Sequence, residues 1–239
     1  MPVNRFFSEQ PFSEGDLISL EGEEFHHLVN ATRKRIGDLV EVINGNGFLS
    51  TGKLIDIQKN KALIALESVI EEAAPNVHII LIQAIPRLNR LDTIIEKATE
   101  LGVFAIHLFP GDTSERKELS SSSLARLKKI TQSAIKQSGH LHLPKILMFQ
   151  SLKESLPEKG LLFFGDVDPH APLLMDVMTQ SESIAIVIGP ESGLTSNEEA
   201  LLKKERGVGV KLSNAILRTD TAPIVALGLM SHILMRKEA

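Results

Sequence analysis

The chain has 239 residues, of which 43% are hydrophobic and 23% are charged, and its formal net charge is −4. This balance predicts a globular protein with one large or two smaller domains, and it argues against a disordered chain or a protein that binds polyanions indiscriminately. The absence of cysteine excludes disulfides, thiolate metal sites and a cysteine nucleophile. We expect a cytoplasmic protein, because residues 1–7 lack a signal-peptide core and no apolar run reaches the roughly 20 residues that span a bilayer.

Residues 1–72 are typical of a small β-rich domain. Strand-like runs cover 39–43, 48–57 and 62–69. The turn Asn44–Gly47 between the first two contains two Asn-Gly pairs, and these supply the positive φ angles of tight reversals. We expect a compact barrel.

A polar, proline-containing segment at 71–76 predicts a domain boundary, which divides the chain into domains 1–72 and 73–239. Beyond it, apolar runs of strand length alternate with helical patterns. Such alternation predicts an α/β domain with a mostly parallel sheet covered on both faces. The predicted strands are 77–85, 104–109, 145–149, 161–164, 184–188 and 208–212.

Positive charge gathers between residues 116 and 153, where Glu118 is the one acid. On a helix through this segment Arg126, Lys129 and Lys136 share a face, which indicates either an RNA-binding surface or a solvated helix face. Six further basic residues are candidates for RNA contact: Arg5, Arg33, Lys34, Arg35, Arg87 and Arg90.

Two loops after predicted strands are candidates for a ligand site, because ligands of open α/β sheets bind beyond the carboxyl ends of the strands. The first is Gly189-Pro190-Glu191-Ser192-Gly193, followed by Thr195 or Ser196 as a helix cap with Glu198 or Glu199 completing a capping box. It lacks the Lys-Ser/Thr pair of a phosphate-binding loop. A purely structural strand–turn–helix remains the alternative.

The second loop runs from Leu212 to Pro223 and places Arg218 two residues before Asp220. With Thr219 or Asp220 as its cap, the amides of the last helix would face the same crevice as the first loop. An Asp that only caps the helix and an Arg that only pairs with it remain the alternative.

Other candidate chemistry is weaker. His26-His27 and His140-Leu141-His142 come without the carboxylates or cysteines of a metal site, so no metal is expected. Ser192 lacks the Gly-x-Ser-x-Gly elbow of an acyl-transfer nucleophile.

Together these loops resemble the paired cofactor loops of SPOUT-class RNA methyltransferases, through Gly189-Pro190-Glu191 with Gly193 and through 216–222 (Ile-Leu-Arg-Thr-Asp-Thr-Ala). The resemblance is closest to the branch that methylates uridine N3 in small-subunit ribosomal RNA. It extends to 96–103, to 134–138 and to an N-terminal PUA-like barrel with His26-His27-Leu28, Arg33 and Gly37-Asp38.

The resemblance implies a trefoil-knotted C-terminal domain, S-adenosylmethionine as cofactor, a homodimer, and ribosomal RNA or a ribosomal subunit as partner. Arg218 and Asp220 would be catalytic, with Arg218 stabilising charge on the uracil and Asp220 orienting or deprotonating the base. The residues implied in cofactor binding are Gly189, Pro190, Glu191, Gly193, Leu212, Ser213, Ile216 and Leu217.

The chain departs from the family pattern at five positions, namely Ser192, Ser213, Ala215, Asp220 and His140. Two alternatives therefore stay open. One is a methyltransferase of this class acting on another RNA or another atom. The other is a non-catalytic RNA-binding or ribosome-assembly factor.

Overall fold

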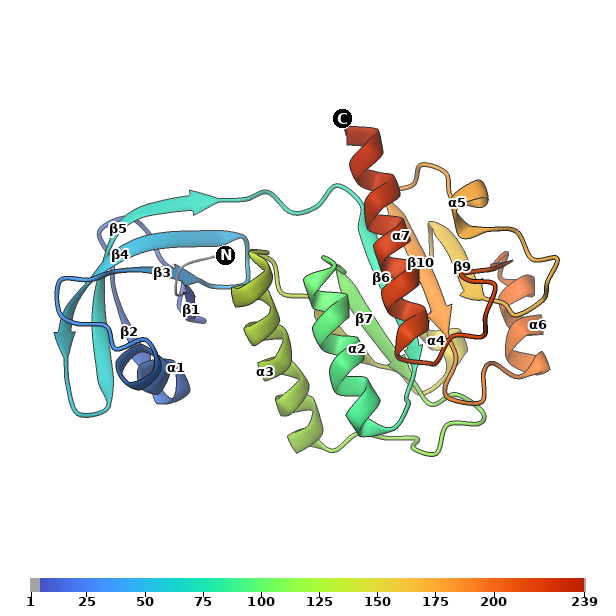
Figure 1. The fold of residues 1–239 in the computed structure, drawn as a ribbon, viewed down its shortest axis with the longest axis horizontal. Coiled ribbons are helices and arrows are strands. Elements are labelled where there is room, and N and C mark those ends of the chain that lie inside the picture. The colour runs from blue at the N-terminus through green and yellow to red at the C-terminus, as the bar shows by residue number, and fades with distance from the viewer. Residues whose placement is uncertain (1–4, 239) are drawn as a thin grey trace. The chain divides into compact units, whose positions relative to one another are not determined.

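The computed structural model describes residues 5–238, and for residues 236–238 it describes the backbone alone. The described residues form two compact units (Figure 1). The first consists of the chain up to Ala74 together with Gln132–Leu143, and the second of Pro75–Thr131 together with the chain from Pro144 onward. No helix in the described part of the chain is long and apolar enough to cross a membrane.

The first unit is built on a five-stranded sheet in the order β1-β3-β4-β5-β2, in which β1 runs parallel to β3 and the other pairs are antiparallel. Its curled strands and the short helix α1 share a core that includes Phe6, Leu20, Phe25 and Leu28 (Figure 1). The elements are β1 (Arg5–Phe7), β2 (Leu17–Glu21), α1 (Gly22–His26) with a π-helical turn (His27–Ala31), β3 (Leu39–Ile43), β4 (Phe48–Ile57) and β5 (Lys61–Glu71).

The predicted reversal between β3 and β4 is confirmed. Gly45 and Gly47 have φ angles of 75° and 91°, and the Asn44 side chain accepts hydrogen bonds from the N–H groups of Asn46 and Phe48. The three predicted strands of this unit are present, whereas β1, β2 and α1 were not predicted. These elements are too short to show a clear hydrophobic period.

The long helix α3 (Ser121–Ser138) contributes its last residues to the first unit. Ile135 is fully buried in a cluster with Phe7, Ile43 and Leu141, and the Lys136 ammonium lies 2.5 Å from the Glu24 carboxylate. Apart from the contact with Leu141, these contacts join positions more than 90 residues apart, so hydrophobic periodicity alone does not predict them. A segment within the predicted 73–239 domain thus packs with the N-terminal strands.

The second unit contains a six-stranded sheet in the order β11-β9-β10-β6-β7-β8, with every neighbouring pair parallel. All six strands were predicted from the sequence. They are β6 (His78–Ala84), β7 (Ala105–Phe109), β8 (Lys145–Met148), β9 (Leu161–Gly165), β10 (Ser183–Ile188) and β11 (Val208–Val210).

Helices cover both faces of this sheet, as predicted. Side chains of β6 alternate between two cores because successive residues of a strand point to opposite faces. One core joins the sheet to α2 (Leu88–Glu100), α5 (Leu174–Val177) and α7 (Thr221–Glu238). The other joins it to α4 (Leu152–Ser155) and α6 (Ser196–Lys204).

Candidate active site

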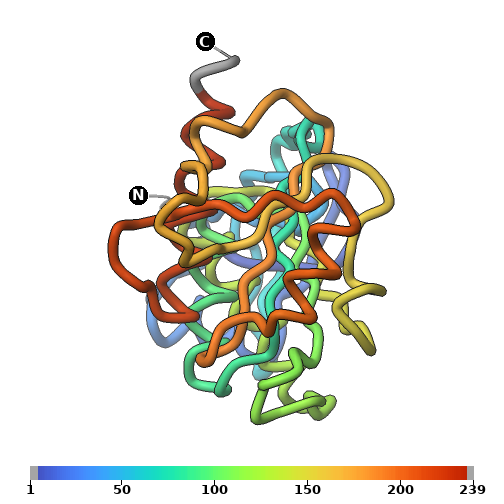
Figure 2. The backbone as a smooth tube through the Cα atoms, turned by 90° about the vertical axis from the view of Figure 1, so that its right-hand side faces the viewer, coloured from blue at the N-terminus to red at the C-terminus, as the bar shows by residue number. Residues whose placement is uncertain are grey.

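A cavity of about 440 Å³ lies beyond the carboxyl ends of β9, β10 and β11. Its walls come from Glu199 and from parts of three segments, 165–169, 188–194 and 211–222, which belong to the yellow-to-red part of the backbone in Figure 2. Arg218 and Asp220 lie within the third segment but do not line the cavity. All eight residues predicted to bind the cofactor line it: Gly189, Pro190, Glu191, Gly193, Leu212, Ser213, Ile216 and Leu217. The two loops singled out in the sequence thus form one cavity.

The first loop turns sharply before α6. A capping box fixes its end: the Thr195 hydroxyl accepts from the N–H of Glu198, and the Glu198 carboxylate accepts from the N–H of Thr195 at 2.7 Å. The predicted helix cap is therefore confirmed. At Gly189 a Cβ atom would lie 2.7 Å from the backbone of Gly193 and Leu194, so only glycine allows the loop to fold back on itself there.

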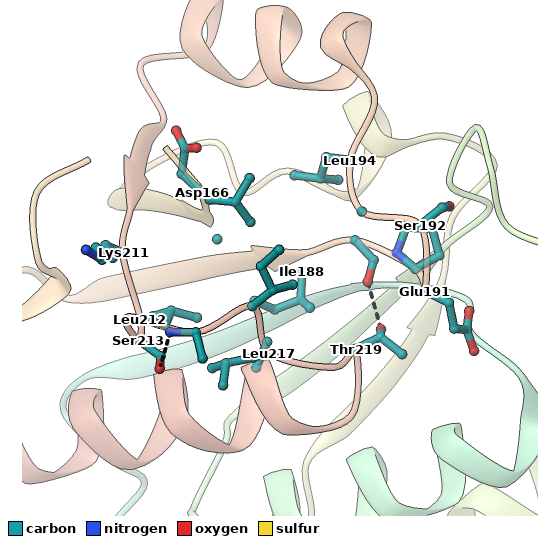
Figure 3. A pocket seen from close by; sticks show the side chains of 18 of the residues that line it. Asp166, Ile188, Glu191, Ser192, Leu194, Lys211, Leu212, Ser213, Leu217 and Thr219 are labelled. Carbon is teal, nitrogen blue, oxygen red and sulfur yellow. Dashed lines mark hydrogen bonds between the residues drawn. The ribbon is translucent and has the colours of Figure 1, made fainter. Parts of the chain in front are cut away.

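The second loop lines the cavity and leaves several of its backbone polar groups without an intramolecular partner. Its one internal contact before Arg218 is the bond from the N–H of Ala215 to the Ser213 hydroxyl at 3.1 Å (Figure 3). Within residues 5–238, the N–H and C=O groups of Leu212, Ile216 and Leu217 form no hydrogen bond. These groups are available to a polar ligand.

Thr219 ties the two loops together. Its hydroxyl donates to the carbonyl oxygen of Gly189 at 2.8 Å, as the dashed line in Figure 3 shows. The buried amide of Gln83, at the end of β6, donates to the Thr219 hydroxyl at 3.2 Å. The sequence did not mark Gln83 at all and indicated Thr219 only as a possible helix cap, because an apolar strand and a helix start explain the two residues without a ligand.

The two predicted catalytic residues differ in surroundings. The Arg218 side chain is exposed and has no partner among the described residues. The Asp220 carboxylate accepts from Arg90 at 2.9 Å, and Arg90 lies 3.6 Å from Glu191 of the first loop. Glu191 also accepts from the backbone N–H of Arg87 at 3.0 Å. Arg90, predicted to contact RNA, is thus engaged by both pocket loops.

Several of the other predicted RNA-binding residues are also paired with acids. Arg5 lies 2.7 Å from Glu41, and Lys136 is bonded to Glu24. Arg126 pairs with Asp92. Lys34 donates to the carbonyl of Leu39, while Arg33, Arg35 and Lys129 are exposed.

Arg87 forms a solvent-exposed ion pair with Glu115 at 2.5 Å. The hydrogen bond and charge of Glu115 raise the pKa of Arg87, and Arg87 in turn lowers the pKa of Glu115. RNA binding by the nine basic residues stays a prediction.

The sequence matches two family models. An RNA methyltransferase domain matches residues 72–231, and an RNA methyltransferase PUA domain matches residues 20–67. The first match covers well over half of the chain. This chain belongs to the RNA methyltransferase family.

Relatives of this RNA methyltransferase extend over nearly its whole length. The ribosomal RNA small subunit methyltransferase E of Bacillus subtilis is 28% identical, with 96% of each chain covered. The crystal structure of the Neisseria gonorrhoeae ribosomal RNA small subunit methyltransferase E bound to S-adenosyl methionine has a TM-score of 0.85, with 30% identity and 96% and 97% coverage. A predicted RNA methyltransferase from Thermotoga maritima has a TM-score of 0.79, with 27% identity and 99% and 100% coverage.

The pocket of this RNA methyltransferase fits S-adenosylmethionine in size and chemistry. Its volume lies within the roughly 300–1,000 Å³ of small-molecule sites. Ile188, Leu194, Leu212 and Leu217 give it apolar walls (Figure 3), and the unpartnered backbone groups of the second loop can bond the edge of an adenine. The cavity can therefore hold a molecule of the kind bound in the Neisseria gonorrhoeae structure, S-adenosyl methionine.

The structure adds pocket residues that sequence reasoning missed. Gly165 ends β9 and is followed by Asp166 and Val167, and Lys211 comes directly after β11. No motif marks them, and only the parallel pairing of β9 with β10 and β11 brings them to the cavity. Among residues 5–238 no cluster of three or more His, Asp or Glu could hold a metal ion.

Proposed function

We propose that this RNA methyltransferase transfers a methyl group from S-adenosylmethionine to N3 of a uridine in small-subunit ribosomal RNA. The observation that carries the proposal is that one cavity is lined by all eight of the predicted cofactor-binding residues, which come from both loops. The small-subunit ribosomal RNA methyltransferases from Bacillus subtilis and Neisseria gonorrhoeae, which match nearly the whole chain, support the substrate.

Bound S-adenosylmethionine supplies an electrophilic methyl group. The loops at Gly189–Gly193 and Leu212–Leu217 would hold the cofactor and align that methyl group, which lowers the entropic part of the barrier. Uridine N3 must lose its proton, which Asp220 or water would accept, and negative charge then develops on the uracil edge. The exposed guanidinium of Arg218, next to the lining residues Leu217 and Thr219, would stabilise that charge. Asp220, held by Arg90, would orient the base.

We further propose that residues 1–72 form the PUA-like domain that helps to hold RNA, while residues 73–239 form the methyltransferase domain with a knotted chain. The exposed positive charges of Arg33, Arg35 and Lys129 suit contact with phosphates. An enzyme of this class would work in the cytoplasm, where ribosomal RNA is modified.

A homodimer is part of the proposal. Large apolar side chains are exposed around the pocket, at Val167, Leu173, Met175 and Ile216, and Ile216 is 85% exposed although it lines the cavity. Apolar groups gathered in this way favour a protein interface. Sedimentation of a single species with the mass of one chain would contradict the dimer.

The decisive experiment is methyl transfer from labelled S-adenosylmethionine to unmethylated small ribosomal subunits, naked ribosomal RNA and transfer RNA, with the product mapped by nucleoside mass spectrometry. N3-methyluridine from ribosomal substrate alone is the expected result. Label on another nucleoside or on transfer RNA would overturn the substrate. The absence of both label and cofactor binding would favour a non-catalytic RNA-binding factor.

The role of Arg218 has its own test. Arg218→Ala should lower the single-turnover rate strongly while cofactor affinity and dimer mass stay unchanged, because the side chain has no described intramolecular partner to lose. Arg206→Ala, an exposed arginine of the turn after α6, is a control for loss of one positive charge. Equal rates in wild type and Arg218→Ala would contradict the assigned role.

A further inference from the structure

Gln83 is the most completely buried amide side chain near the pocket, at 0% exposure. It is the second-last residue of the central strand β6 and contacts both pocket loops. Its Nε2 atom lies within hydrogen-bond distance of four acceptors: the carbonyl oxygens of Ala84 (3.0 Å), Gly189 (3.3 Å) and Ile188 (3.5 Å) and the hydroxyl of Thr219 (3.2 Å). Three separate stretches of chain therefore meet at one nitrogen.

The direction of these bonds is fixed by chemistry. Carbonyl oxygens only accept, so the side of the Gln83 amide that faces three of them must be its NH₂ group. The Thr219 hydroxyl gives its one proton to Gly189 and therefore accepts from Gln83. We call this chain of hydrogen bonds, from Gln83 through Thr219 to Gly189, the relay. The other polar atom of the amide, Gln83 Oε1, is buried without a partner among the described residues.

An orphaned buried carbonyl is costly, and an apolar residue would avoid that cost in the core of a parallel strand. The hydrogen bonds that the Gln83 NH₂ group donates must therefore offset the cost of burying its carbonyl oxygen without a partner. What the amide gains is contact with both pocket loops at once. Thr219 lies between Arg218 and Asp220, and Gly189 opens the loop that carries Glu191.

We propose that Gln83 is a positioning residue that couples the two pocket loops, so that the loop around Gly189 and the segment carrying Arg218 adopt their binding arrangement together. The inference rests on the proposed function for its consequence in catalysis. Its structural part, the coupling of the loops, stands on the relay alone.

Hydrogen exchange followed by NMR in the cofactor-free protein tests the coupling directly. Three amides report on the loops: Gly193, bonded to the carbonyl of Pro190, and Thr221 and Ala222, both bonded to the carbonyl of Arg218. Gln83→Met keeps the side-chain size but removes the donors, so all three amides should exchange about tenfold faster, as expected for loss of a buried hydrogen bond. Gln150→Met, an exposed position in the same unit, is the matched control.

Faster exchange at Gly193 alone, or at none of the three, would overturn the coupling. If Gln83→Met does not fold, Thr219→Val and Thr219→Ser decide. Valine removes the hydroxyl and should reproduce the faster exchange, whereas serine keeps it and should restore the wild-type rates. Equal rates in valine and serine variants would contradict the relay.

Cofactor affinity supplies the second readout. S-adenosylhomocysteine should bind Gln83→Met and Thr219→Val about tenfold more weakly by calorimetry, at a temperature where each variant is fully folded, and Thr219→Ser with wild-type affinity. If Gln83→Met and Thr219→Val both bound S-adenosylhomocysteine with wild-type affinity, the relay would serve stability only, and this result would overturn the positioning role. If wild-type protein took up no S-adenosylhomocysteine, the proposed function would fail, while amide exchange would still decide the coupling.

Discussion

Replacing Arg90 by methionine removes a guanidinium that pairs with an acid on each of the two pocket loops. Its guanidinium lies 2.9 Å from Asp220 and 3.6 Å from Glu191, and the Arg90 side chain is only 21% exposed. Methionine preserves most of the side-chain length and its apolar contacts. The substitution leaves two partly buried carboxylates without their shared counter-charge, so both the ion pair and the placement of the loops suffer.

The expected magnitude follows from the burial of the pair. Exposed ion pairs contribute about 0–1 kcal/mol, and removing one partner of a fully buried pair costs about 3–5 kcal/mol. The Arg90–Asp220 pair, at 21% and 27% exposure, lies between these limits, at about 1–2 kcal/mol. For a protein of this size that corresponds to a fall in Tm of about 2–8 °C.

Thermal unfolding of Arg90→Met and Arg87→Met measures the effect against a matched control. Both arginines belong to the start of α2 and both pair with an acid, but Arg87 is 59% exposed and its pair with Glu115 is open to solvent. Arg87→Met should leave the Tm unchanged, and Arg90→Lys should fall between wild type and Arg90→Met because an ammonium replaces the forked guanidinium. Equal shifts in the two methionine variants would refute the assignment of Arg90 to the pocket.

Three further outcomes are expected. Gly189→Ala should weaken binding of S-adenosylhomocysteine in calorimetry, because its Cβ would lie 2.7 Å from the backbone of Gly193, whereas Gly228→Ala has no atom within 4 Å to meet and should bind normally. Thr195→Ala should lower the stability measured by urea unfolding by about 1 kcal/mol through loss of the capping box, and a change smaller than the error of that measurement would contradict the role of the cap. Burial lowers the pKa of His107, so the unfolded chain binds a proton at His107 more readily than the folded chain does. The stability should therefore fall as the pH drops below 6.5, the ordinary value for histidine, and His107→Gln should lessen that fall. Urea unfolding at pH 5 to 7.5 measures the effect, and an equal dependence of stability on pH in wild type and variant would contradict it.

The sequence alone supports the larger part of the fold. In the second unit the inner strands, such as β6 and β10, are buried on both faces, so their residues form continuous apolar runs. The edge strands β8 and β11 are partly exposed, but they too are short apolar runs, and all six strands could be predicted. The Asn44–Gly47 reversal and the Thr195 cap were also predictable, because their chemistry is local. The elements that sequence reasoning missed, such as β1 and α1, hold too few residues to show a period.

For the site, the sequence by itself indicated the two loops that line the cavity, because two glycines, a proline and a helix cap in the first loop and a helix start in the second are local signals. The tertiary structure alone decided which side chains meet there. Arg90 and Asp220 are 130 positions apart, and Gln83 and Thr219 are 136 apart. The sequence around these residues does not predict either contact, because the residues meet only when parallel pairing brings the carboxyl ends of the strands to one edge of the sheet.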